Sequence, residues 1–129
     1  MPVQLRSINA KSAPQAVGGY SQALETTNDT RRLYISGQIP VTRDGTVPES
    51  FSAQARLAWT NVLAQLEAAD MTISNLVKVT IFLSDRKFAL ENRQARQDAL
   101  GDHAPALTVI IAGIFDEAWL LEIEAIAEA

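Results

Sequence analysis

The chain has 129 residues, of which 47% are hydrophobic and 20% are charged, values close to those of an ordinary globular domain. The absence of cysteine excludes disulfides, thiol nucleophiles and thiolate zinc sites, and one histidine, His103, cannot form a two-histidine metal site. Eleven Lys and Arg against fifteen Asp and Glu give a net charge of −4, which argues against nucleic acid or an anionic membrane as a partner. We therefore expect a single domain over residues 1–129, without a metal ion.

The N-terminal part of the chain is rich in strand and turn signals. Its first residues are too polar for a signal peptide, and no apolar run approaches the ~20 residues that span a bilayer, so we expect a soluble, cytoplasmic protein. A proline and two glycines predict a loop over residues 11–19, and Asn28-Asp29 predicts a turn. Apolar patterning predicts three strands, over residues 3–8, 20–26 and 31–36, with a tight turn to follow at Arg43-Asp44-Gly45.

Two helices alternate with three strands in the rest of the chain. Apolar residues at three- and four-residue steps predict a helix from about Ser50 to Ala69, with Ser50 as its N-cap. A second helix is expected over about 88–100, where Gly101 is a stop signal. The β-branched run 77–83 predicts an interior strand, and apolar residues predict two further strands over 106–112 and 119–127.

This order of elements predicts an α+β fold, in which a mixed sheet of about six strands carries two helices on one face. Two helices cannot cover both faces of such a sheet. Nevertheless, the strand over 106–112 is apolar on both sides, which requires burial on both. We therefore expect further copies of the chain to cover the second face.

Catalytic motifs that can be recognised from residue types are few. The chain has no G-x-S-x-G nucleophile elbow and no glycine-rich phosphate loop, and His103 is interpreted as a loop residue. Glu122 and Glu124 lie two residues apart on one face of their predicted strand. Two interpretations are open at this point: a solvated strand face, or a carboxylate at an interface that orients water or a substrate proton.

Several segments, spread in order over nearly the whole chain, resemble the YjgF/RidA family of reactive intermediate deaminases (Rid). The combination of Ser-Gly-Gln-Ile-Pro at 36–40 with the ending Ile-Glu-Ala-Ile-Ala at 123–127 is specific. The matching segments are GYSQA at 19–23, YISGQIP at 34–40, QAR at 54–56, NLVKVTIFL at 75–83, Asn92, PA at 105–106 and EIEAIA at 122–127.

The resemblance implies a chorismate-mutase-like fold and a homotrimer with three small-molecule clefts between its subunits. Active members hydrolyse enamines and imines, such as 2-aminoacrylate and its imine tautomer, to a 2-keto acid and ammonia, without a metal or an organic cofactor. In this scheme an arginine holds the substrate carboxylate by a two-pronged ion pair. A glutamate and backbone groups orient the attacking water.

The residues of the implied cleft carry over position by position. Tyr20 matches the family's cleft tyrosine, and Ser36 matches the serine of the S-G-Q-I-P motif. Asn92 matches a cleft-facing asparagine of the second helix. Glu122 matches the family's glutamate, so the resemblance favours a catalytic role for it over a merely solvated strand face.

The arginine of the family segment P-A-R-[ST] is missing. The segment reads Pro105-Ala106-Leu107-Thr108 here, so the resemblance places Leu107 and Thr108 in the substrate-binding cleft. Leucine cannot bind a carboxylate, and Glu122 keeps its negative charge there. We therefore expect altered or lost deaminase activity and a ligand that is neutral, cationic or more apolar than a 2-imino acid. Restoring the arginine with Leu107→Arg is expected to raise activity on 2-iminopropanoate.

Three alternatives are open. Another arginine, Arg32, Arg93 or Arg96, could supply the missing charge. The protein could also be a non-enzymatic trimer that binds a small ligand or a partner on the same scaffold. Endoribonuclease activity, an older name for the family, is disfavoured by the acidic charge and by the lack of a base paired with a nucleophile.

Overall fold

The computed structural model describes residues 2–16 and 19–129, and every helix and strand expected from the sequence is found within them. The ends of the elements differ from the expected ones by a few residues. In chain order they are β1 (Gln4–Ile8), β2 (Ala23–Thr27), β3 (Arg32–Gln38), α1 (Phe51–Ala68), the short 3-10 helix η1 (Ile73–Asn75), β4 (Leu76–Leu83), the 3-10 helix η2 (Arg86–Phe88), α2 (Ala89–Leu100), β5 (Ala106–Ile111) and β6 (Leu121–Glu128).

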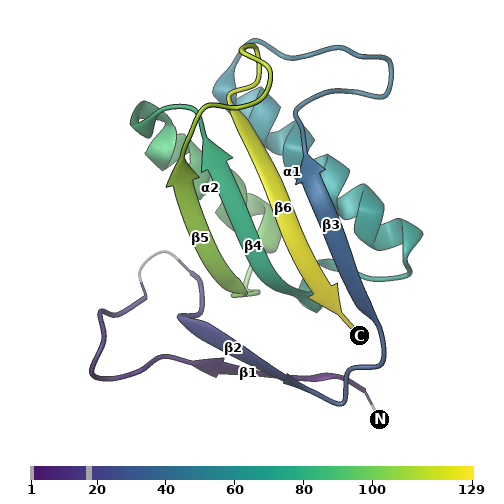
Figure 1. Cartoon of the computed structure of the whole chain (residues 1–129), viewed down its shortest axis with the longest axis vertical. Helices are drawn as coiled ribbons and strands as arrows, with labels where there is room; N and C mark the ends of the chain where they lie inside the picture. Colours follow the sequence, from purple (N-terminus) through teal and green to yellow (C-terminus); the bar gives the residue numbers. More distant parts are fainter. Residues whose placement is uncertain (1, 17–18) are drawn as a thin grey trace.

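The main sheet has four strands in the order β3-β6-β4-β5. β4 and β5 run parallel, whereas β6 is antiparallel to both of its neighbours, β3 and β4. Helices α1 and α2 lie on the same face of this sheet, which leaves the opposite face open (Figure 1). The α+β fold with a mixed sheet and two helices on one face is therefore confirmed.

The sheet is smaller than expected, because β1 and β2 form a separate two-stranded antiparallel sheet. This hairpin meets the main sheet near Ser21, whose backbone N–H donates to the Pro105 carbonyl at 3.1 Å. The Ser21 hydroxyl donates to the Ala104 carbonyl at 2.5 Å. Beyond Ser21 the chain leaves β5 and pairs with β1 instead, so the expected sheet of about six strands is divided into four and two, and β5 is an edge strand (Figure 1).

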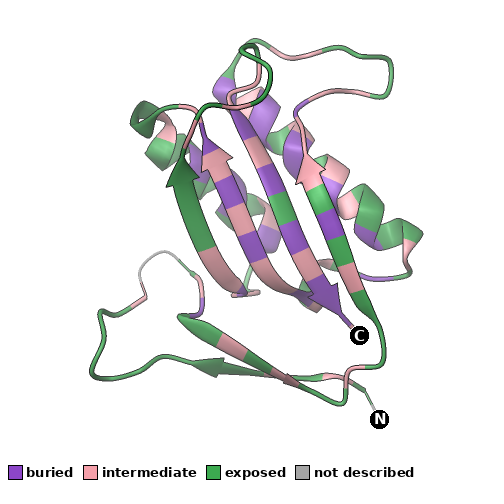
Figure 2. Cartoon of the chain, viewed as in Figure 1, coloured by how far each residue is buried: buried purple, intermediate pink, exposed green. Residues whose placement is uncertain are grey.

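One face of α1 packs onto the sheet and forms the core. Ser50 caps this helix as expected, since its side chain accepts from the Ala53 N–H at 3.2 Å. Buried and more exposed positions alternate along β6, as the two-residue period of a strand requires (Figure 2). The buried stripe of α1 comprises Phe51, Ala55, Ala58, Trp59, Val62 and Leu66, and the sheet contributes Val79, Ile81, Leu121 and Ile123 to the same core.

The edge strand β5 is exposed over most of its length (Figure 2). Val109, Ile110 and Ile111 are 40%, 40% and 38% exposed, although all three are strongly apolar. The burial on both faces that this sequence requires is therefore not reached within one chain. None of the described helices is both long enough and apolar enough to cross a membrane.

Candidate ligand pocket between α2 and β5

A pocket of about 330 Å³ lies between helix α2 and the edge strand β5. Two residues singled out from the sequence, Tyr20 and Leu107, line it together with Val109. Leu107 faces the helices, because its register partner Val79 is a fully buried core residue and paired side chains share a face. Val109 follows two residues later and points to the same side, because side chains two residues apart in a strand share a face. This two-residue spacing from Leu107 could have identified Val109 as a pocket residue from the sequence.

Helix α2 contributes two arginines, Arg93 and Arg96, to this pocket. They lie three residues apart, so they are neighbours on one side of the helix. Arg96 is buried, with 5% of its surface exposed, whereas Arg93 is exposed. Burial lowers the pKa of the Arg96 guanidinium from its usual value, and the nearby charge of Arg93 lowers it further. Arginine remains charged at neutral pH even so.

The pocket is therefore positively charged. Over residues 2–16 and 19–129, no carboxylate is among its lining side chains. Two like charges in a partly buried site repel each other, and an anion bound between them relieves that repulsion. This geometry favours α2 as the source of the charge that Leu107 lacks. Arg32 lies elsewhere, on β3, where its Nε is 2.9 Å from Asp29 Oδ2 and 3.1 Å from Glu128 Oε1.

Neither Asn92 nor His103 is among the residues that line this pocket. Asn92 is 3% exposed, and its Oδ1 has no hydrogen-bond partner in the described part of the chain. His103 Nε2 lies 2.6 Å from the Leu76 carbonyl, which ties the loop before β5 to the start of β4. Among the described residues, no cluster of three or more acidic or histidine side chains could hold a metal ion.

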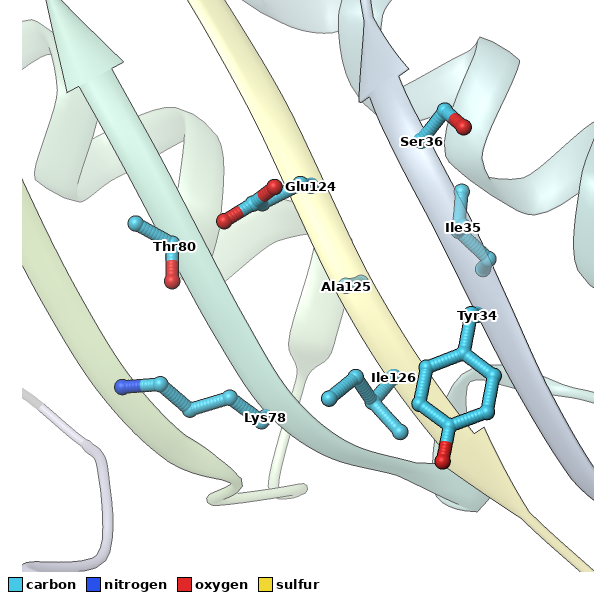
Figure 3. A pocket seen from close by; sticks show the side chains of 8 residues that line it. All are labelled: Tyr34, Ile35, Ser36, Lys78, Thr80, Glu124, Ala125 and Ile126. Carbon is cyan, nitrogen blue, oxygen red and sulfur yellow. The ribbon is translucent and has the colours of Figure 1, made fainter.

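The other residues predicted for the cleft lie on the open face of the sheet. Figure 3 shows Ser36 on β3, Lys78 and Thr80 on β4 and Glu124 on β6, around a pocket of about 300 Å³. Thr108 on β5 pairs with Thr80, and its hydroxyl accepts from Lys78 Nζ at 2.6 Å. Ser36 and Thr108 are therefore separated from the α2–β5 pocket by the sheet itself.

Glu122 belongs to the open face as well, because it is two residues from Glu124 on β6. Its side chain lies against the backbone of Gly37, where an added Cβ would be 1.8 Å from Glu122 Oε2. The contact occurs where the pairing of β3 with β6 shifts register. Glycine at position 37 therefore leaves the space that the Glu122 carboxylate occupies, a contact that the residue types alone do not reveal.

Leu107 and Glu122 lie on opposite faces of the sheet in one chain. Leu107 pairs with Val79 on the helix side, whereas Glu122 pairs with Phe82 on the open side. The backbone of the sheet separates the two side chains. A small ligand that contacts both positions therefore has to lie between two copies of the chain.

Gly37→Ala is expected to lower the free energy of unfolding by about 1–3 kcal/mol, because the new methyl group displaces the Glu122 side chain. Urea unfolding of the variant measures this cost. In a Glu122→Ala background the methyl group meets no carboxylate, so the same substitution is expected to cost much less. An equal cost in both backgrounds would show that the backbone at residue 37, rather than the contact with Glu122, sets the penalty.

The fold and the pocket define a class first: a small α+β protein with a positively charged pocket, sized for a small molecule, at one edge of its sheet. Sequence comparison then gives the family. The family model described as Endoribonuclease L-PSP, which represents the YjgF/RidA proteins, matches residues 10–129. The chain belongs to this family, and the resemblance in its motifs is confirmed.

Similar proteins include one that is named as a deaminase and several solved structures. The 2-iminobutanoate/2-iminopropanoate deaminase of Escherichia coli is 35% identical over 126 residues, which are 95% of this chain and 96% of that protein. The crystal structure of E. coli TdcF with bound serine has a TM-score of 0.72 at 30% identity, covering 96% of this chain and 98% of the other. The Rid protein YyfB from Yersinia pestis shares the fold, with a TM-score of 0.85 at 23% identity over 97% of this chain and 98% of its own.

Proposed function

We propose that the chain hydrolyses small imines that carry a carboxylate, with Arg93 and Arg96 in the role of the arginine that Leu107 replaces. The observation that carries this proposal is that both arginines line the same pocket as Leu107 and Tyr20. The E. coli relative named 2-iminobutanoate/2-iminopropanoate deaminase supports imine chemistry. The serine bound to TdcF supports a ligand of the size of an amino acid.

Leu107 alters which imine fits. Together with Val109 it gives the pocket an apolar wall beside the cationic one, so a substrate with an apolar side chain gains contact there. A cationic ligand, one of the expectations from the sequence, is disfavoured by the two guanidinium groups. The expected substrate is thus a 2-imino acid whose side chain is larger and more apolar than the methyl group of 2-iminopropanoate.

The reaction needs a group that accepts a proton from water, and we assign this role to Glu122 of a second copy. Its carboxylate takes the proton as the water oxygen bonds to the imine carbon. The imine nitrogen gains a proton and becomes the amine of a carbinolamine. Protonation of that amine and deprotonation of the hydroxyl then release ammonia and leave the 2-keto acid. The arginines fix the carboxylate end of the substrate throughout.

A shared site requires assembly, and a homotrimer is expected from the family resemblance and from the exposed apolar side chains of β5. Light scattering is expected to give three times the 14.0 kDa of one chain. A stable monomer at the concentrations used for assays would contradict both the covering of the open face and the intersubunit site.

Ammonia release from imines generated in situ tests the proposed function. The imine of leucine is expected to be hydrolysed with a higher kcat/KM than that of alanine.

Leu107→Arg then separates two interpretations of residue 107. If α2 already holds the carboxylate, the substitution changes activity on 2-iminopropanoate by less than about threefold, a difference of under 1 kcal/mol. A rise of about tenfold or more would favour the expectation from the sequence, in which the natural cleft has no carboxylate holder.

A ligand-binding trimer without turnover is the second candidate. The separation of Leu107 and Glu122 onto opposite faces of the sheet favours it, because catalysis then depends entirely on how two copies meet. Calorimetric binding of a stable 2-keto acid, combined with no ammonia release from any imine tested, would support this candidate over the enzyme.

A further inference from the structure

A series of side-chain hydrogen bonds joins the β1–β2 hairpin to the segment just before β5. Asn9 Nδ2 donates to Ser7 Oγ at 3.2 Å, and Ser7 Oγ lies 2.6 Å from Ser21 Oγ. The Ser21 hydroxyl in turn donates to the Ala104 carbonyl at 2.5 Å. A hydroxyl carries only one hydrogen, so Ser7 is the donor to Ser21, and the three bonds run in one direction, from the end of β1 towards β5.

Ser21 is the buried member of this series. It is 1% exposed, whereas Ser7 and Asn9 are exposed to solvent, where water can replace a lost bond. The position of Ser21 requires a group that donates to a carbonyl and accepts from a hydroxyl, which an alkyl side chain cannot do. Removing the Ser21 hydroxyl therefore takes away a donor to Ala104 that water does not readily replace.

Ser21 stands next to the wall of the α2–β5 pocket. It forms a parallel β-bridge with Ala106, and it follows Tyr20 in the chain just as Leu107 follows Ala106. Tyr20 and Leu107, which both line the pocket, thus come together at this bridge. In the described part of the chain, β1 and β2 form a sheet of their own, so pairing with the main sheet beyond Ser21 does not hold Tyr20 in place.

Tyr20 also faces the cationic side of the pocket. Burial lowers the pKa of the Arg96 guanidinium and Arg93 lowers it further, whereas Tyr20 raises that pKa. The phenol oxygen of Tyr20 therefore lies within electrostatic reach of the arginine that we propose holds the substrate carboxylate.

We infer that Ser21 is a positioning residue of the α2–β5 pocket: its hydroxyl, bonded between Ser7 and Ala104, holds Tyr20 in place as a wall of the site. Ser21 does not line the pocket itself and acts through Tyr20. Its effect on turnover rests on the proposed function, whereas its effect on the position of Tyr20 does not.

Fluorine NMR tests the position of Tyr20 directly. The chain has two tyrosines, Tyr20 and Tyr34, so 3-fluorotyrosine labelling gives two ¹⁹F signals, which a Tyr34→Phe variant assigns. Tyr34 is 69% exposed on β3 and serves as the internal reference. Ser21→Ala is expected to move the Tyr20 signal towards that of free fluorotyrosine and to leave the Tyr34 signal in place.

Ser7→Ala is the matched control, because it removes a partner of Ser21 and keeps the bond from Ser21 to Ala104. Its Tyr20 signal is expected to stay close to that of the natural chain. Ser21→Cys, whose thiol is a weak donor of similar shape, is expected to move the signal in the same direction as Ser21→Ala by a smaller amount. An unmoved Tyr20 signal in Ser21→Cys overturns the inference even if Ser21→Ala fails to fold. Equal movement in Ser7→Ala and Ser21→Ala overturns it as well.

Kinetics of ammonia release then tests whether Ser21 acts through Tyr20. Ser21→Ala is expected to raise KM for the imine of leucine about fivefold and to keep kcat within about twofold, because a wall contact binds the substrate and its transition state alike. In a Tyr20→Leu background the same substitution is expected to change KM by less than about 1.5-fold, since no phenol is left to hold. An equal rise in both backgrounds would show a merely structural role for Ser21. If the natural chain hydrolyses no imine, the proposed function fails, and the ¹⁹F signals alone decide the inference about Ser21.

Discussion

Replacing both Arg93 and Arg96 with glutamine is expected to reduce kcat/KM for a 2-imino acid by about 100-fold, since removing the cationic partner of a half-buried carboxylate leaves that charge unpaired. Arg93→Gln alone is expected to cost about tenfold, because Arg93 is exposed and its contact with the substrate is better hydrated. Steady-state kinetics of ammonia release measures both losses.

Arg86→Gln is the matched control for this loss of charge. Arg86 is an exposed arginine of η2, outside the α2–β5 pocket, so its substitution removes one positive charge, as Arg93→Gln does, without touching the site. Its kcat/KM is expected to stay within about twofold of that of the natural chain. If the double variant of α2 retains full activity, the arginines of α2 do not hold the carboxylate.

Glu122→Gln is expected to lower kcat by about 10²–10⁴-fold with little change in KM, because the amide cannot take a proton from water while the shape of the side chain is kept. The variant is expected to fold normally, since Glu122 lies on the open face of the sheet and glutamine has the same size and shape as the glutamate that packs against Gly37. Ammonia release under single-turnover conditions separates the chemical step from product release.

Glu124→Gln provides the control from the same strand. Glu124 shares the open face of β6 with Glu122 and is exposed. Glu124 lines the pocket of Figure 3, which Glu122 does not, and the Glu124→Gln variant is expected to retain most of the activity. Equal losses in both variants would indicate a general electrostatic effect of the open face, and would argue against a specific role for Glu122.

The secondary structure could be predicted from the sequence because its signals are local. Ser50 begins α1 as its N-cap, and Gly101 ends α2 with a φ of +59°, a backbone conformation that glycine adopts readily. The division of the strands into two sheets could not be predicted. The alternation of apolar and polar residues shows that a strand has two different faces. It does not show which strands form hydrogen bonds with its two edges.

The candidate site was predictable in part. The resemblance to the Rid family brought Tyr20 and Leu107 together, and the structure places both in one pocket. The sequence could not rank Arg93 and Arg96 against Arg32, because arginines on an amphipathic helix usually point to solvent. Their role depends on how α2 packs beside the end of β5, which is a property of the tertiary structure.

The exposed edge of β5 has a consequence for how the protein behaves on dilution. An edge strand presents unpaired N–H and C=O groups, and here it also presents Val109, Ile110 and Ile111 to solvent, so a single chain is a template for further strand pairing. The proposed trimer would stabilise the folded chain by mass action, so the Tm is expected to rise with protein concentration. Dilute samples are therefore expected to dissociate and unfold at lower temperature than concentrated ones.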